Sequence, residues 1–268
     1  CDNHHHEVAT AGQCEIDIKY DLMTNSADGA QTYKYVVRNV AQEFGKVATM
    51  MPKPISMDSG SGMHTNVSLW KKNENTFYDK DEDLELSQIG RYFCGGVMEH
   101  ARGLTAITNP TTNSYHRLVP GYEAPVYIAW SSSNRSATIR IPGHFKGEKY
   151  AYMKRMEYRV PDPASNPYLV FSAVLAAGLD GIKKKIEPGD PVKEDIYKMT
   201  RSERKKHGIE TLPANLGRAL DELESDRKYL APIFSNEVLD KIIELERRDH
   251  REIAIRQHPH EFYLYFDV

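Results

Sequence analysis

The segment RMEYR places one carboxylate between two guanidinium groups. Side chains alternate between the two faces of a β-strand, so Met156 and Tyr158 would face a core. Arg155, Glu157 and Arg159 would share the opposite face. Such a charged face is common on a solvated edge strand. The alternative is a site where the glutamate binds a metal ion and the arginines bind phosphate oxygens through their planar donor forks. This segment alone is compatible with both.

A second acidic pair lies near the start of the chain. Residues 4–18, HHHEVATAGQCEIDI, predict two strand segments joined through an Ala-Gly turn, with Glu7 and Glu15 on one face. For the HHH run, hydrogen bonding behind the metal ligands is the favoured interpretation, and direct ligation is the alternative.

A glycine-containing loop precedes another polar strand face. Gly60 and Gly62 flank a serine, and a loop of this composition lets backbone approach a ligand closely. His64, Asn66 and Ser68 alternate onto one face of the strand that follows. Most such loops are only turns, so the polar strand beside it is what indicates a binding role.

Several arginines are placed where a highly anionic ligand could use them. They lie at strand ends or on polar strand faces: Arg117, Arg135, Arg140, Arg155 and Arg159. Glu123 lies in the loop beyond a Pro-Gly turn, where a solvated charge is the plain interpretation.

Together these residues indicate metal-dependent chemistry. Glu7, Glu15, His64 and Glu157 form a mostly oxygen-donor set suited to Mg²⁺ or Mn²⁺. Divalent ions and guanidinium groups around phosphate oxygens are what phosphoryl transfer requires. The sequence contains no GxxxxGK[ST] motif, so a P-loop would not hold the nucleotide. The residues predict an enzyme that uses ATP or handles phosphate, without identifying its substrate.

The elements that must position these residues are mostly helical. Helices are expected over 28–45, about 84–103, 166–184, about 215–230 and 235–250. The first should bury Val36, Val40 and Phe44, and Asn166 with Pro167 should begin the third. The apolar tail EFYLYFDV would need covering by the same or another subunit.

Composition excludes several classes. A net charge of -3 over 268 residues gives no nucleic-acid footprint. No apolar run approaches the ~20 residues that span a bilayer, so no membrane association is expected. Three dispersed cysteines favour reduced thiols in a cytoplasmic compartment. Because the chain opens at Cys1 inside an apparent strand, it is interpreted as a fragment.

The motifs resemble the signature blocks of type I glutamine synthetase, the bacterial and archaeal form. They occur in family order along essentially the whole chain: HHHEVATAGQCE, MPKPISMDSGSGMH, NPTTNSYHRLVPGYEAP, NRSATIRIP, RMEYRVPDPASNPYL and HPHEFYLYFDV. The resemblance implies an α+β fold, with a curved antiparallel sheet in an open-barrel-like arrangement flanked by helices. Residues 1–185 would form the N-terminally truncated catalytic domain, and 186–268 its helical extension. An N-terminal β-grasp domain and the first catalytic strand would be absent.

The resemblance also implies roles for particular residues. Two Mg²⁺ or Mn²⁺ ions would bind per site, one to Glu7 and Glu15, the other to His64 and Glu157. L-Glutamate would bind to Gly60, Arg117, Arg135 and Arg159. Arg135 and Arg159 would also act in catalysis. ATP would bind near Asn66, Ser68, Arg140 and Arg155. The enzyme would form γ-glutamyl phosphate, which ammonia attacks while Glu123 covers the site and takes the surplus proton.

Some positions depart from the family pattern, and other functions stay open. Ser59 stands where the loop usually has Asn, and His116 replaces a common Lys. Two metal-ligating glutamates and an aspartate would lie in the absent part, so the fragment alone is expected to be inactive. The full-length family forms dodecamers of two hexameric rings. Tyr197 aligns with a tyrosine that some relatives adenylylate, and a plain loop tyrosine is the alternative. A glutamate–amine ligase and a non-catalytic structural relative stay open as other functions.

Overall fold

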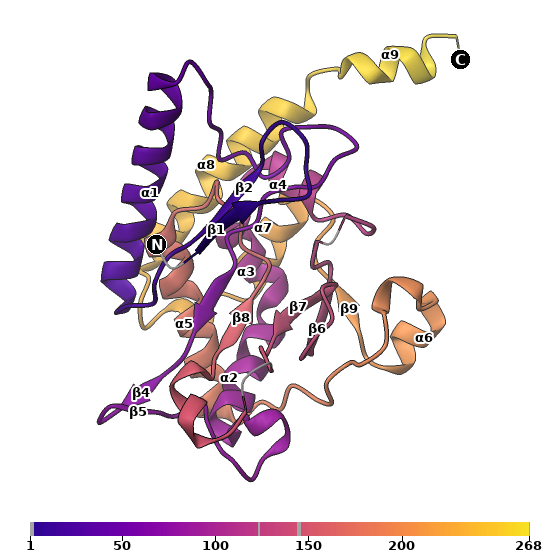
Figure 1. Ribbon diagram of the computed structural model, residues 1–268. Helices are drawn as coiled ribbons and strands as arrows, with labels where there is room; N and C mark the ends of the chain where they lie inside the picture. The colour runs from indigo at the N-terminus through magenta and orange to yellow at the C-terminus, as the bar shows by residue number, and fades with distance from the viewer. Residues whose placement is uncertain (1–2, 123, 144–145, 268) are drawn as a thin grey trace.

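A five-stranded sheet with helices packed behind it forms the framework of the protein (Figure 1). The computed structural model describes residues 3–122, 124–143 and 146–267. The strand order is β3-β8-β7-β6-β9, and neighbours are antiparallel except for the parallel pair β6 and β7. The α+β class with helices flanking the sheet is confirmed, whereas the sheet is mixed and not wholly antiparallel. Its strands are β3 (Thr65–Val67), β6 (Tyr127–Ser131), β7 (Ala137–Arg140), β8 (Met156–Tyr158) and β9 (Glu210–Thr211).

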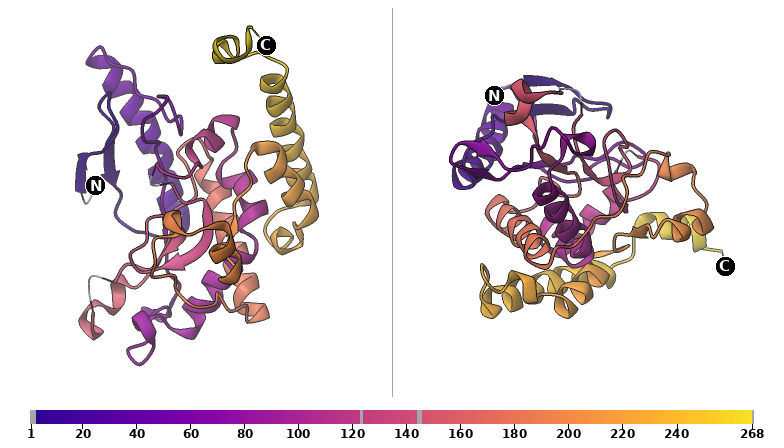
Figure 2. Two further views of the ribbon diagram at one scale, coloured as in Figure 1. Left: turned by 90° about the vertical axis from the view of Figure 1, so that its right-hand side faces the viewer. Right: turned by 90° about the horizontal axis from the view of Figure 1, so that it is seen from below.

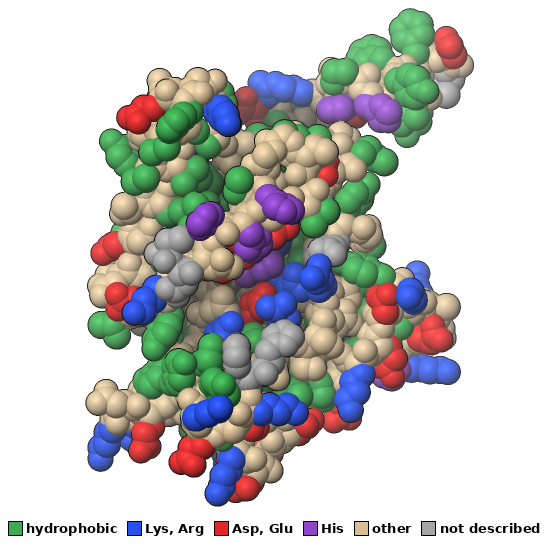
Figure 3. Space-filling model, in the orientation of Figure 1, with side chains coloured by type: hydrophobic (Ala, Val, Ile, Leu, Met, Phe, Trp, Pro, Cys, Tyr) green, Lys and Arg blue, Asp and Glu red, His purple; other side chains and the backbone are tan. Residues whose placement is uncertain are grey.

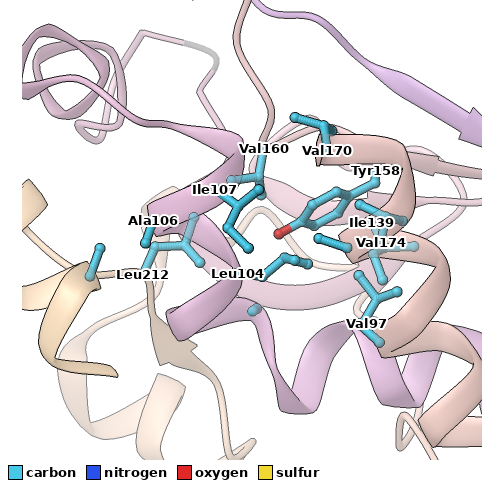
Figure 4. Close-up of a cluster of buried hydrophobic side chains, with 14 of the residues drawn as sticks. Val97, Leu104, Ala106, Ile107, Ile139, Tyr158, Val160, Val170, Val174 and Leu212 are labelled. Atoms are coloured by element: carbon cyan, nitrogen blue, oxygen red, sulfur yellow. The ribbon is translucent and has the colours of Figure 1, made fainter. Parts of the chain in front are cut away.

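Strand β8 is central, which resolves the two interpretations of its charged face. Glu157 pairs with Asn66 on β3 and with Arg140 on β7. Met156 and Tyr158 are fully buried on the other face, among apolar side chains from β7, α3 and α5 (Figure 4). Glu157 is only 4% exposed, so the face it occupies is not a solvated edge.

Two small hairpins accompany the main sheet. Strands β1 (Asn3–His6) and β2 (Cys14–Asp17) pair antiparallel, as expected, and lie on the side of the sheet opposite to α2, α5 and α7 (Figures 1 and 2). Strands β4 (Trp70–Lys71) and β5 (Glu74–Asn75) form the other hairpin.

Helices α2 and α5 cross at glycine residues behind the sheet. A Cβ atom at Gly96 would lie 2.2 Å from the Ala177 carbonyl oxygen, and one at Gly181 would lie 2.2 Å from the Tyr92 carbonyl oxygen. The Asn166 side chain accepts a hydrogen bond from the Tyr168 N–H at the start of α5, which confirms the expected cap. The helices are α2 (Gln88–Glu99), α3 (Ala101–Thr108), α4 (Thr112–Arg117), α5 (Pro167–Lys184), α6 (Arg201–Lys206) and α7 (Leu216–Ser225).

The helix expected over 84–103 is two helices, because the chain bends at His100. This residue ends α2 and precedes α3, and it is 4% exposed. Its Nδ1 lies 2.5 Å from Asp226 Oδ2, and its Nε2 lies 2.9 Å from Asp180 Oδ2. The imidazole also stacks on Tyr229, with ring centroids 3.8 Å apart. The side chain of His100 therefore ties the bend to α5 and to the end of α7.

The prediction of which side chains the first helix buries is wrong. Helix α1 (Met23–Glu43) begins earlier than predicted, and its buried residues are Ala27 and Ala30. Val36, Val40 and Phe44 are exposed. Small alanines let α1 approach α5 closely, so the packed side is the one with short side chains.

The C-terminal region is helical apart from β9, which pairs with the edge of the main sheet. Helix α8 (Asn236–Ala254) packs beside α7, whereas α9 (Pro259–Tyr265) projects from the body with its aromatic side chains exposed (Figures 1 and 2). Among the described residues, no helix is both long and apolar enough to cross a membrane.

Candidate active site

Two carboxylates and an imidazole converge at the β1–β2 hairpin. His5 lies opposite Glu15 in the ladder, and Glu7 directly follows β1. His5 Nδ1 is 3.6 Å from Glu7 Oε1, and His5 Nε2 is 4.0 Å from Glu15 Oε2. One ligand atom from each of these residues lies within 4.8 Å of the others. The hairpin thus brings together the two glutamates that the sequence paired, and adds His5.

The electrostatics of this group fit a divalent cation. Burial, together with a hydrogen bond to Glu7, raises the pKa of Glu15 to about 6. Two carboxylates this close cannot both be ionised at low cost without a cation between them. Carboxylate oxygens with one imidazole are also a donor set that Mg²⁺ or Mn²⁺ accepts.

A second group surrounds Glu157 on the sheet. His64 Nδ1 lies 3.3 Å from Glu157 Oε1, and Arg140 Nη2 lies 2.6 Å from Glu157 Oε2. The Arg159 Nε is 3.6 Å from Glu157 Oε1. Burial alone would raise the pKa of Glu157, but the His64 hydrogen bond and the two guanidinium charges outweigh it and lower that pKa. Burial lowers the pKa of His64, so its neutral, ligand-competent form is favoured. The pair His64–Glu157 thus offers a neutral imidazole beside an ionised carboxylate.

The glycine loop packs against Arg117. A Cβ atom at Gly60 would lie 2.9 Å from Arg117 Cγ, and one at Gly62 would lie 2.6 Å from Arg117 Nη2 and 2.9 Å from His64 Nε2. Arg117 is buried, and its guanidinium donates to the backbone carbonyl oxygens of Arg159 at 3.0 Å and Val160 at 2.7 Å. Arg117 therefore joins the loop to the end of β8 by donating to backbone carbonyl oxygens.

Residues expected near a nucleotide lie along β3 and the start of β8. Arg155 Nε donates to Asn66 Oδ1 at 2.9 Å. Ser68 Oγ accepts from Trp70 Nε1 at 2.9 Å. The negative charge of Asp17 on β2 also acts on the pKa of Arg155, opposing the lowering caused by burial. In the middle of this face of the molecule, histidine, basic and acidic side chains gather around a hollow (Figure 3).

The remaining expected residues lie at the β6–β7 side of the site. Arg159 Nη1 donates to the Arg135 carbonyl oxygen at 3.0 Å. Tyr197 Oη donates to the Ala124 carbonyl oxygen at 2.5 Å, which fixes the residue next to the expected flap glutamate. Glu123 itself lies outside the described residues.

Sequence reasoning missed Thr10 and Asp58 near the hairpin, and it named His5 only within the HHH run, where direct ligation was the less favoured interpretation. His5 has the same parity as Glu7 two positions on, so strand alternation could have placed it in the acidic group. Thr10 and Asp58 are joined by hydrogen bonds across 48 positions, for which the sequence offers no local signal.

Comparison with known proteins gives consistent matches. The family model for the glutamine synthetase catalytic domain matches residues 1–265. The glutamine synthetase of Sulfolobus acidocaldarius is 55% identical over 265 residues, which cover 98% of this chain and 56% of that protein. The Archaeoglobus fulgidus glutamine synthetase is 46% identical, with 99% and 54% covered. The chain therefore spans about 56% of the first relative's length.

Solved structures agree with this match. A structure described as a GmaS/ADP complex superposes with a TM-score of 0.88 at 34% identity, covering 99% of this chain and 60% of that one. A Plasmodium falciparum glutamine synthetase superposes with a TM-score of 0.86 at 32% identity, covering 98% and 58%.

Proposed function

Since the chain belongs to the glutamine synthetase catalytic-domain family, we propose that the protein ligates ammonia to L-glutamate with ATP, giving L-glutamine through γ-glutamyl phosphate. The observation that carries this proposal is the buried Glu157 held between His64, Arg140 and Arg159 beside an acidic hairpin. Such a face combines ligands for divalent ions with donors for phosphate oxygens.

Two Mg²⁺ or Mn²⁺ ions would be held by the chain's own carboxylates and imidazoles. Glu7 and Glu15 would hold one, and His64 with Glu157 the other. Bound there, the ions would neutralise phosphate charge and polarise the transferred phosphoryl group. The protein's part is to keep His64 neutral and Glu157 ionised, and the pKa directions of both residues support this.

The arginines would bind the charge that moves during phosphoryl transfer. Arg140 and Arg155 would contact ATP phosphates near Asn66 and Ser68, while Arg135 and Arg159 would bind the phosphoryl group and the glutamate γ-carboxylate. The superposable GmaS structure is described as an ADP complex, which supports a nucleotide in this hollow.

The glutamate substrate would lie between Gly60 and Arg117. The γ-carboxylate oxygen would attack the γ-phosphorus of ATP, and ADP would leave. Ammonia would then attack the acyl carbon, phosphate would leave, and Glu123 would take the surplus proton. Excluding water protects the acyl phosphate from hydrolysis.

Assembly and location are proposed from the family. We expect a homo-oligomer, a dodecamer of two hexameric rings, in the cytoplasm. Residues 1–185 would form the catalytic part and 186–268 its extension in the same domain, which the pairing of β9 with β6 supports. The apolar surface of α9 would be covered within that assembly. Tyr197 stays a candidate modification site.

A chimera tests the function directly. This chain would replace the matching 56% of the Sulfolobus acidocaldarius relative, and glutamine formation from glutamate, ATP and ammonium with Mg²⁺ would be measured. Glu157→Gln should reduce turnover by at least about 100-fold, and Glu99→Gln on exposed α2 surface is the control. Ligation of another amine only would identify an amine ligase, and no ligation of any amine would identify a non-catalytic relative. The 268-residue chain alone should be inactive.

A further inference from the structure

Two loops meet in front of the sheet, and each carries a different part of the site. We call residues 7–13, between β1 and β2, the hairpin loop, and residues 57–62 the glycine loop. The hairpin loop begins with Glu7 of the acidic group, and the glycine loop packs on Arg117. Their sequences are far apart, and hydrogen bonds that involve side chains join them.

Asp58 makes the strongest of these contacts. Its Oδ2 accepts hydrogen bonds from the Thr10 N–H at 2.8 Å and from Thr10 Oγ1 at 2.5 Å. Its Oδ1 accepts from the Ser59 N–H at 2.8 Å within its own loop. The hydrogen bonds from Thr10 lower the pKa of Asp58, so its ionised form is the one that joins the loops.

Gln13 makes a second connection, which reaches Glu7 through the backbone. Its Nε2 donates to the Gly60 carbonyl oxygen at 3.0 Å and to Ser61 Oγ at 3.1 Å. The backbone carbonyl oxygen of Gln13 accepts a hydrogen bond from the Glu7 N–H at 2.9 Å. Hydrogen bonds of Gln13 thus connect Glu7, a candidate metal ligand, to the glycine loop, which is expected to border the substrate.

Both loops contain strained backbone next to these contacts. Ala11 has φ of 59° and Met57 has φ of 61°, a left-handed conformation that non-glycine residues adopt at a cost. Such conformations persist where surrounding contacts hold them. The hydrogen bonds of Asp58 and Gln13 are among the contacts that lie next to these two residues.

We propose that Asp58 is a positioning residue that couples metal binding at Glu7 and Glu15 to glutamate binding at the glycine loop. The inference rests on the proposed function. A metal ion that orders the hairpin loop would, through Thr10 and Asp58, order the glycine loop as well. Because such coupling is reciprocal, glutamate should also tighten metal binding. A purely structural contact would add stability without linking the two affinities.

The test uses the chimera described above and measures Mn²⁺ affinity by calorimetry with and without glutamate. We expect glutamate to tighten Mn²⁺ binding about 10-fold in the unsubstituted chimera, and Asp58→Ala to bring that ratio close to 1. The variant should raise KM for glutamate about 10-fold and change kcat less than about threefold. Asp240 is an exposed carboxylate on α8, and Asp240→Ala should leave both the glutamate effect on Mn²⁺ affinity and the KM for glutamate unchanged.

A second pair of variants decides the matter if Asp58→Ala does not fold. Thr10→Val removes only the hydroxyl donor and should weaken the coupling between metal and glutamate binding. Thr10→Ser keeps the hydroxyl donor and should keep the coupling. If glutamine formation is intact but the affinity ratio in Asp58→Ala equals that of the unsubstituted chimera, the positioning role is overturned and the proposed function stands. If Asp58→Ala does not fold, the ratio in Thr10→Val decides in the same way. Absence of ligation by the unsubstituted chimera would instead overturn the proposed function.

Discussion

Replacing Glu246 by glutamine should stabilise this protein, because the carboxyl group lies where its charged form has no partner. Glu246 is on α8, and its Oε2 atom is buried without a hydrogen-bond partner among the described residues. Burial, together with the charge of Asp249, raises the pKa of Glu246 to about 9. In the unfolded chain the same group is hydrated and has its ordinary pKa of 4.5.

The sign and size of the effect follow from this difference in pKa. Above pH 4.5 the unfolded chain releases a proton that the folded protein retains, so the free energy of unfolding falls as pH rises and levels off above about pH 9. At about pH 7, two and a half pH units at about 1.4 kcal/mol each amount to about 3.5 kcal/mol. Glutamine cannot ionise, but its amide is still desolvated, so we expect a net gain of about 1–2 kcal/mol.

Urea unfolding of the chain and its variant at about pH 5 and about pH 8 measures this gain. The difference in unfolding free energy should be below about 1 kcal/mol at the lower pH and should grow at the higher one. Glu244→Gln is the matched control on the same helix, since Glu244 is exposed and pairs with Lys241 at 2.9 Å. If Glu246→Gln is neutral or destabilising at the higher pH, the carboxylate is solvated or paired and the reasoning fails.

Three other substitutions test the site and the packing behind it. Gly62→Ala would place a Cβ atom 2.9 Å from His64 Nε2, and it should reduce turnover of the chimera by about 100-fold while thermal melting shows an intact fold. His100→Phe removes both aspartate hydrogen bonds at the α2–α3 bend, and urea titration should show a loss of about 3 kcal/mol. Gly181→Ala pushes α5 off a backbone carbonyl of α2, and we expect a loss of about 3 kcal/mol or more, or failure to fold on circular dichroism.

The sequence was informative where a pattern is local. Alternation over the RMEYR segment predicted one buried and one polar face, and both faces of β8 match it. The Asn-Pro start of α5 was predictable for the same reason, since a cap and its helix are neighbours in the chain.

The sequence misled where the outcome depends on a distant partner. The apolar stripe on α1 indicated a helix correctly, but nothing local shows that α5 packs on Ala27 and Ala30 instead. The bend at His100 depends on Asp180 and Asp226, which lie on later elements. The parallel pairing of β6 with β7 was not predicted either, because their connection, residues 132–136, is shorter than the dozen or more residues that parallel neighbours usually need.

The strand order also determines when the site can form during synthesis. Asn66 on β3 pairs with Glu157 on β8, about ninety residues later, and β9 joins the sheet only at residue 210. Chains are made from the N-terminus, and pairings this distant close slowly. A nascent chain that stops before β8 therefore contains both loops and His64, but it lacks the strand that joins β3 to the rest of the sheet. Early truncations should be inert precursors that need protection from aggregation, and they should lack even weak phosphate-binding activity.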